Sequence, residues 1–297
     1  MRADHPIKRT FEDMLRVTAI GPTIQKMVRR SGCGILVYHD PKPDTLDAHL
    51  SHLKRSNVFV SLDDLLAATS GDAPLPNRGL VLCFDDGHAG NWNLINVLRR
   101  HKVRPTIFVC SAIVGTGRMF WWQYPSVGSH VERMKRLPNR QRVSLLAQAG
   151  FDQTAEWPER RALSFSELHD LLDVADIQAH TRFHPILTRC SDEECETELV
   201  RARVEIEQLT GKKCEHFAYP NGNYDQRVVG LVRRAGYKCA RALDIGWNHV
   251  GTDPFRLRSI TIPDNASIAW LDAQLTGLPT YLRYLRGGCV SGLMPQF

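Results

Sequence analysis

Residues 81–88 read Val-Leu-Cys-Phe-Asp-Asp-Gly-His, and the rest of the chain can be interpreted around them. A mostly apolar run ends in two carboxylates and a glycine, and a helix-like segment follows from Asn91. This pattern is typical of a buried strand ending in a loop, where parallel sheets and barrels place their functional groups. Neighbouring side chains on an extended strand point in opposite directions, so one carboxylate could bind a cation while the other faces substrate or water. Asp-Asp-Gly alone is equally a common turn or helix cap.

The stretches around residues 81–88 alternate between strand-like and helix-like patterns. Strands are expected over residues 34–39, 81–84, 106–110, 175–179, 215–218, 237–242 and 256–262. Helical leucine spacing and capping boxes lie between them, as at Ser164 with Glu167 and Ser191 with Glu194. Repeated strand-then-helix units imply a mainly parallel sheet, and about seven of them favour a closed or nearly closed barrel.

The remaining segments divide the chain. We expect a helical extension at 1–33, a main domain at 34–265 and a helical tail at 266–297. Residues 111–163 interrupt the alternation and have too few apolar residues for a core of their own, so they predict an insertion. Trp121 and Trp122 in this insertion could stack on a sugar ring or pin the insertion to the domain.

Composition narrows the classes of function. Lys and Arg total 38 against 32 Asp and Glu, and residues 1–30 hold seven of these basic and three of these acidic residues. This basic segment and the apolar tail could contact a membrane surface, although no polybasic block occurs and such a charge bias is more often simply solvated surface. No run is apolar enough to cross a bilayer, and no signal-peptide core is present. Neither a nucleic-acid motif, a phosphate-binding glycine loop nor Gly-x-Ser-x-Gly occurs.

The eight cysteines form no Cys-x-x-Cys pair, and those at 83 and 110 lie in apolar runs. Buried thiols in a reducing compartment explain this usage better than disulfides do. The sequence therefore predicts a cytoplasmic protein, with peripheral contact to the inner membrane or to a lipid-linked sugar as an additional hypothesis.

A histidine pair follows the predicted strand 175–179. His180 and His184 are four residues apart, so on a helical turn they would share a face and could grip one cation. A carboxylate from the loop after strand 81–84 would complete a two-histidine, one-carboxylate site. His-x-x-x-His alone is weak evidence, but both motifs fall where an apolar strand ends, which in a parallel barrel is the same rim.

A turn follows the predicted strand 215–218. Tyr219, Pro220, Asn221 and Gly222 form a rigid sequence that could present backbone N–H groups and an aromatic wall to a ligand. By themselves these residues also fit an ordinary tight loop.

The three motifs together resemble the polysaccharide deacetylases of the NodB-homology type, carbohydrate esterase family four. Residues 84–87 are similar to the first family motif, 180–185 to the second, and 217–222 to the third in the branch that deacetylates exopolysaccharides. The opening run 37–39 also fits that branch. The likeness covers about residues 34–262 and implies a distorted (β/α) barrel. It implies metal-dependent removal of an N-acyl group from an amino sugar of a polysaccharide, oligosaccharide or lipid-linked precursor.

The resemblance also implies a role for each matching residue. Asp86, His180 and His184 would hold one divalent ion, for which Zn²⁺ is the first choice and Co²⁺ or Ni²⁺ are the alternatives. Asp85 would be the general base. The turn at 219–222, Asn221 above all, would complete an oxyanion hole.

Two features depart from the family pattern. Phe217-Ala218 stands where an arginine and a proline are usual, so another group must orient Asp85, and Arg256 and Arg258 are candidates. The late Leu-x-His motif that supplies a general acid is not evident, which leaves His249 as a candidate.

Two other functions remain open. A catalytically weak or inactive carbohydrate-binding barrel is suggested by the missing acid. An Fe(II) oxygenase could use the same three ligands. However, such sites usually carry the carboxylate near a histidine in sequence, on a jelly roll rather than an α/β fold.

Overall fold

The structure is a computed structural model that describes residues 32–276. Nearly all of the predicted N-terminal extension, and the predicted tail beyond Thr276, lie outside these residues. The hypothesis of membrane contact through those two segments therefore also lies outside them. Within residues 32–276, no helix is long and apolar enough to cross a membrane.

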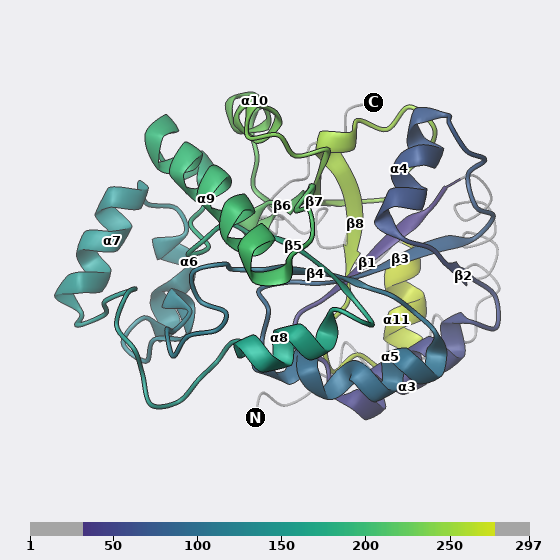
Figure 1. Cartoon of the computed structure of the whole chain (residues 1–297), viewed down its shortest axis with the longest axis horizontal. Coiled ribbons are helices and arrows are strands. Elements are labelled where there is room, and N and C mark those ends of the chain that lie inside the picture. Colours follow the sequence, from purple (N-terminus) through teal and green to yellow (C-terminus); the bar gives the residue numbers. More distant parts are fainter. Residues whose placement is uncertain (1–31, 277–297) are drawn as a thin grey trace.

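Seven parallel strands close into a barrel. They are β1 (Gly34–Tyr38), β3 (Gly79–Phe84), β4 (Thr106–Val109), β5 (Asp176–Ala179), β6 (His216–Ala218), β7 (Cys239–Ile245) and β8 (Leu257–Thr261). The order is β1-β8-β7-β6-β5-β4-β3, and β3 pairs back to β1. The predicted distorted (β/α) barrel is thus confirmed (Figure 1).

Strand β3 is where the barrel is distorted. Its first residues, Gly79 and Leu80, pair with the short strand β2 (Val58–Phe59), whereas Cys83 and Phe84 pair with β4. Two residues of β2 are too few to leave an alternating pattern, so the sequence did not predict this strand. The change of partner carries the end of β3, with the two aspartates, to the rim between β1 and β4.

Helices surround the strands (Figure 1). The helices outside the insertion are α3 (Pro43–Leu53), α4 (Leu62–Ser70), α5 (Ile95–His101), α8 (Phe165–Leu171), α9 (Asp192–Thr210), α10 (Gln226–Arg234) and α11 (Ile268–Leu275). Short 3₁₀ turns lie at η1 (Ala89–Leu94), η4 (Leu187–Arg189), η5 (Pro220–Gly222) and η6 (Pro254–Arg256). The capping boxes predicted at Ser164 and Ser191 are confirmed, since each hydroxyl accepts from the glutamate N–H three residues later.

The core has an inner and an outer part. Ile35 and Val37 of β1 belong to the inner cluster, whereas Leu36 and Tyr38 belong to the outer one beneath the helices. Strands buried on both faces read as continuous apolar runs, which is why the strand positions were predictable. Leu271 and Leu275 of α11 are buried in the outer part, so the described start of the predicted tail packs on the domain.

The insertion projects to one side of the barrel (Figure 1, left). It contains η2 (Trp121–Gln123), η3 (Gly128–His130), α6 (Val131–Met134) and α7 (Asn139–Gln148). The prediction that it lacks a core was wrong in part: a small cluster is buried within it, consisting of Met119, Trp121, Val127, Leu146 and Phe151. Aromatic rings bury enough area for so few residues to form this cluster.

Candidate metal centre and active site

The predicted functional residues gather at one end of the barrel. Asp85 and Asp86 follow β3, His180 follows β5, and Tyr219 follows β6. All barrel strands are parallel, so their carboxyl ends share a rim. Strand β4 lies between β3 and β5, so the loop with the two aspartates and the loop with the two histidines are close together on this rim.

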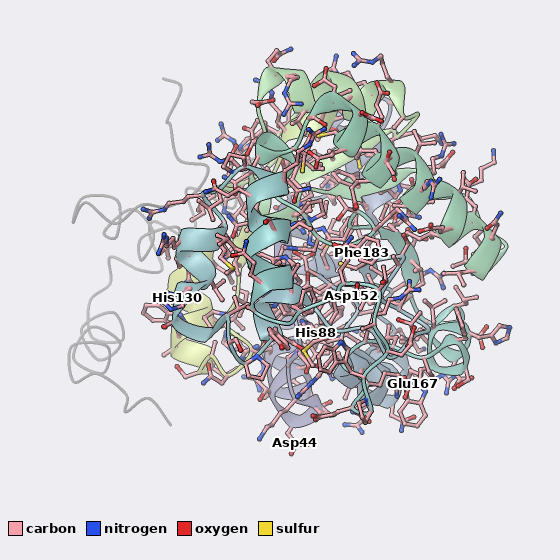
Figure 2. All side chains as sticks on the ribbon, turned by 90° about the vertical axis from the view of Figure 1, so that its left-hand side faces the viewer. Asp44, His88, His130, Asp152, Glu167 and Phe183 are labelled. Carbon is pink, nitrogen blue, oxygen red and sulfur yellow. The ribbon has the colours of Figure 1, made fainter. Side chains whose placement is uncertain are left out.

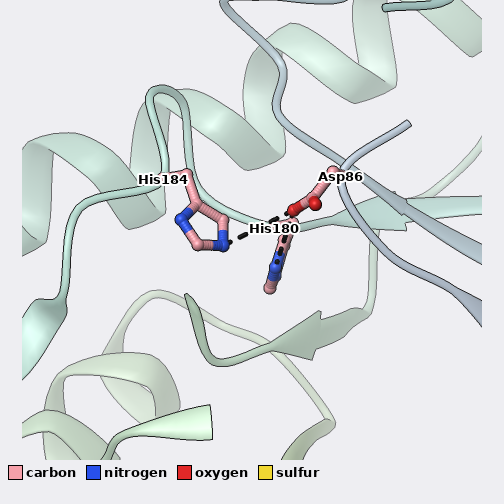
Figure 3. A group of neighbouring side chains, drawn as sticks. All are labelled: Asp86, His180 and His184. Atoms are coloured by element: carbon pink, nitrogen blue, oxygen red, sulfur yellow. Dashed lines mark ion pairs between the residues drawn. The ribbon is translucent and has the colours of Figure 1, made fainter. Parts of the chain in front are cut away.

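Asp86, His180 and His184 form one compact, buried group. A ligand atom of each lies within 4.8 Å of the others, and Oδ1 of Asp86 is 3.5 Å from Nε2 of each histidine. Figure 3 shows both rings directed at this carboxylate. A tetrahedral ion held at ordinary zinc distances would separate its ligand atoms by about 3.4 Å. The spacing therefore suits a bound ion.

Two further observations show that these residues fit a cation. Oδ1 of Asp86 is buried and has no hydrogen-bond partner within residues 32–276, which is costly unless a positive group satisfies it. Nδ1 of His180 lies 2.8 Å from the carbonyl oxygen of Ala218, so a proton there leaves the Nε2 lone pair facing Asp86.

Protonation favours the same conclusion. Burial lowers the pKa of both His180 and His184 below the usual 6.5, so both rings are neutral at physiological pH, the form that can bind a metal ion. Burial alone would raise the pKa of Asp86. The hydrogen bond with His88 and the positive charge of that ring outweigh burial, and the pKa of this carboxyl lies well below its usual range.

The histidines meet on a loop, not on the helical turn that their spacing predicted. Thr181 and His184 have φ of 65° and 55°, in the left-handed region, and Asp86 likewise has φ of 72°. Such conformations cost roughly 1–3 kcal/mol for residues other than glycine and persist only where surrounding contacts impose them. Two of the three candidate ligands, Asp86 and His184, therefore have a strained backbone conformation.

Arg241, not Arg256 or Arg258, holds Asp85. Its Nη2 lies 2.5 and 2.6 Å from the two carboxylate oxygens, and both side chains are buried. Arg256 instead bonds Gln226, and Arg258 is exposed. The sequence held a signal for this contact, because Arg241 lies between two alanines at a strand position that alternation turns inward.

The turn at 219–222 offers one backbone donor. The N–H of Tyr219 donates to the carbonyl oxygen of Arg241, and the N–H of Gly222 donates to the carbonyl oxygen of Tyr219. The N–H of Asn221 has no partner within residues 32–276. Asn221 adopts φ of 56°. The predicted aromatic wall is not formed by Tyr219, whose buried ring donates its hydroxyl proton to the carbonyl oxygen of Phe255, 3.0 Å away.

The two tryptophans have different surroundings. Trp121 is buried, and its Nε1 donates to the carbonyl oxygen of His184 at 3.1 Å, so it pins the insertion to the loop. Trp122 is half-buried, and its ring centroid lies 4.4 Å from that of His184 and 4.9 Å from that of Phe120. Only Trp122 is thus placed where its ring could meet a ligand beside His184.

Two histidines near the site were not predicted to act there. Nε2 of His88 lies 3.2 Å from Oδ2 of Asp86 and holds the carboxylate through the oxygen that is not the one nearest His180 and His184. His39 follows β1, and the pairing of Tyr38 with Phe84 places it beside Asp85 on the rim. His39 is half-buried, and its charge contributes to lowering the pKa of Asp86. In the view from the insertion side, His88 and Phe183 lie near the centre (Figure 2).

His249 lies elsewhere. The preceding residue, Asn248, pairs with Cys33, which comes just before β1. This position is at the amino ends of the strands, away from the rim that carries Asp85 and Asp86. The candidate acid suggested by the sequence is therefore at the wrong end of the barrel.

Comparisons with known proteins agree with this geometry. The family model for polysaccharide deacetylase matches residues 72–240. No curated protein matches the sequence. Among solved structures, Streptococcus pyogenes deacetylase PplD in complex with acetate has a TM-score of 0.62 at 17% identity, covering 83% of this chain and 99% of its own.

Two further structures are also similar. IcaB from Ammonifex degensii has a TM-score of 0.62 at 18% identity, covering 84% of this chain and 98% of its own. BC0361, a polysaccharide deacetylase from Bacillus cereus, has a TM-score of 0.58 at 18% identity, covering 82% of this chain and 69% of its own. At these identities the likenesses show the fold. The family match spans more than half of the chain and includes both aspartates and both histidines, so the chain belongs to the polysaccharide deacetylase family.

Proposed function

We propose that this protein is a metal-dependent hydrolase that removes an N-acetyl group from an amino sugar of a glycan. The observation that carries the proposal is the buried Asp86–His180–His184 group, next to a second carboxylate held by Arg241. Oδ1 of Asp86, which both rings face, accepts no hydrogen bond from the part of the chain that the structure describes. Two imidazole nitrogens and one carboxylate oxygen suit Zn²⁺, and Co²⁺ or Ni²⁺ also accept such ligands.

Asp86, His180 and His184 would hold the ion. When bound, such an ion lowers the pKa of a water molecule and polarises the amide carbonyl. Asp85 takes a proton from the attacking water, and Arg241 keeps the carboxylate in place at the rim for this step. The N–H of Asn221 donates to the oxygen of the former carbonyl as negative charge develops there. Trp122 offers a flat face to the sugar ring beside His184.

A proton must also reach the leaving amine, and His39 is the best-placed donor. It sits beside Asp85 on the rim, its main-chain N–H donates to Oδ1 of Asp264 at 3.0 Å, and its carbonyl accepts from Asn91 at 2.8 Å. These two bonds fix the backbone from which the imidazole projects. The general acid in this proposal is therefore His39.

Replacing His39 by glutamine is expected to lower kcat by about 10²-fold or more, in the range for a lost general acid. Metal affinity should be unchanged, since His39 is not among the candidate ligands. His249→Gln serves as the control and should retain the parent rate. Steady-state deacetylation kinetics check both variants. A parent-like rate in His39→Gln together with a loss in His249→Gln would exclude His39 as the donor.

The function itself is tested by incubating the purified chain with N-acetylated chito-oligosaccharides and Zn²⁺, Co²⁺ or Ni²⁺. We expect equal release of acetate and free amine, loss of activity on chelation and recovery when metal returns. Metal analysis of the protein provides an independent readout. Absence of both stoichiometric metal and turnover on any N-acyl sugar would instead support a carbohydrate-binding barrel without catalysis.

A further inference from the structure

Helix α9 places a carboxylate beneath the loop that joins the two candidate histidine ligands. Oε2 of Glu198 accepts hydrogen bonds from two consecutive backbone N–H groups, those of Arg182 at 2.7 Å and Phe183 at 3.1 Å. The positive charges of Arg182 and Arg142 also attract this carboxylate. Glu198 has no contact with Asp86 among the described hydrogen bonds and ion pairs, so the proposed chemistry does not account for it.

The opposite side of the same loop is held by the segment after β4. The N–H of Ser111 donates to the carbonyl of Thr181 at 3.1 Å, and that of Ala112 donates to the carbonyl of Arg182 at 3.2 Å. The loop's carbonyl groups thus bond one segment of the chain and its N–H groups bond Glu198. Together these contacts fix both edges of the peptide plane between the ligands.

Such fixing is needed because the loop is not a regular element. Thr181 and His184 are both left-handed, so the N–H groups between them have no helical or sheet partner. An acceptor that bonds two successive N–H groups stabilises this conformation. Without it, the loop could relax towards ordinary φ values and move the ring of His184 away from that of His180.

We propose that Glu198 is a positioning residue that sets the separation of the His180 and His184 imidazoles, and hence the affinity of the metal centre. This inference rests on the proposed function in that it takes these two histidines as metal ligands. Partners that orient metal ligands typically change metal affinity by about 10–100-fold when they are removed.

Metal titration of the metal-free full chain tests the inference. With Co²⁺ as the probe and its absorption spectrum as the readout, Glu198→Ala should weaken binding by about 10–100-fold. Glu198→Gln keeps an oxygen acceptor and should recover most of the affinity. Glu205→Ala is the matched control: Glu205 lies two turns along the same helix and bonds the Arg182 side chain at 2.8 Å and Ser111 Oγ at 2.6 Å, not the loop backbone. Parent-like Co²⁺ affinity in Glu198→Ala would overturn the inference.

Hydrogen exchange separates this inference from the function it builds on. In the metal-free protein, Glu198→Ala should lose protection at the Arg182 and Phe183 amides, and Glu205→Ala should keep it. Unchanged exchange at these amides refutes the positioning role whether or not the parent binds metal. If the parent binds no metal but the protection is lost as expected, the proposed function fails while the loop contact stands.

Discussion

Asp85→Asn is expected to lower kcat for deacetylation by about 10²–10⁴-fold, the range for a lost general base. An amide oxygen has almost no basicity, so the attacking water would keep its proton. The side chain is nearly the same size, and the three candidate metal ligands are untouched. Metal content should therefore remain that of the parent, which a metal analysis alongside the kinetics will show.

A matched control distinguishes chemistry from general damage. Asp176→Asn changes a half-buried carboxylate that begins β5, at the opposite end of that strand from the rim. This variant should keep kcat within a few-fold of the parent value. Parent-like turnover by Asp85→Asn would rule out Asp85 as the base, whereas equal losses in both variants would point to an effect on folding.

The fold could be predicted because most barrel strands are buried on both faces. Apolar runs such as 81–84 and 106–110 left little alternative to buried strands, and glutamates three residues after Ser164 and Ser191 marked helix starts. Local patterns of this kind act over a few residues, so sequence alone reveals them. The pairing of β2 with β3 depends on two residues and left no comparable pattern.

The site was predictable only as far as strand order determines it. Residues that follow parallel strands share a rim, which brought Asp86, His180 and His184 together without knowledge of the loop. The conformation between the histidines was predicted wrongly as a helical turn. The backbone of this loop is bonded by Glu198 from 15 and 16 residues away, a contact that spacing does not reveal.

Contacts between distant segments were the least predictable. Asp85 and Arg241 are separated by 156 positions, and nothing local to Asp85 identifies its partner. The informative feature was an arginine between two alanines, at a strand position whose side chain alternation turns into the barrel, since a buried charge needs a counter-charge. His39 was missed for a similar reason, because its place beside Asp85 follows from the register of β1 on β3.

Arg241→Met is expected to destabilise the protein by about 3–5 kcal/mol, the usual result of leaving one member of a buried ion pair unpaired. Arg241 is 0% and Asp85 3% exposed, so water cannot replace the lost guanidinium. Urea unfolding followed by circular dichroism measures the change. In the double variant Asp85→Leu/Arg241→Met no charge remains, and much of the stability should return even though activity does not.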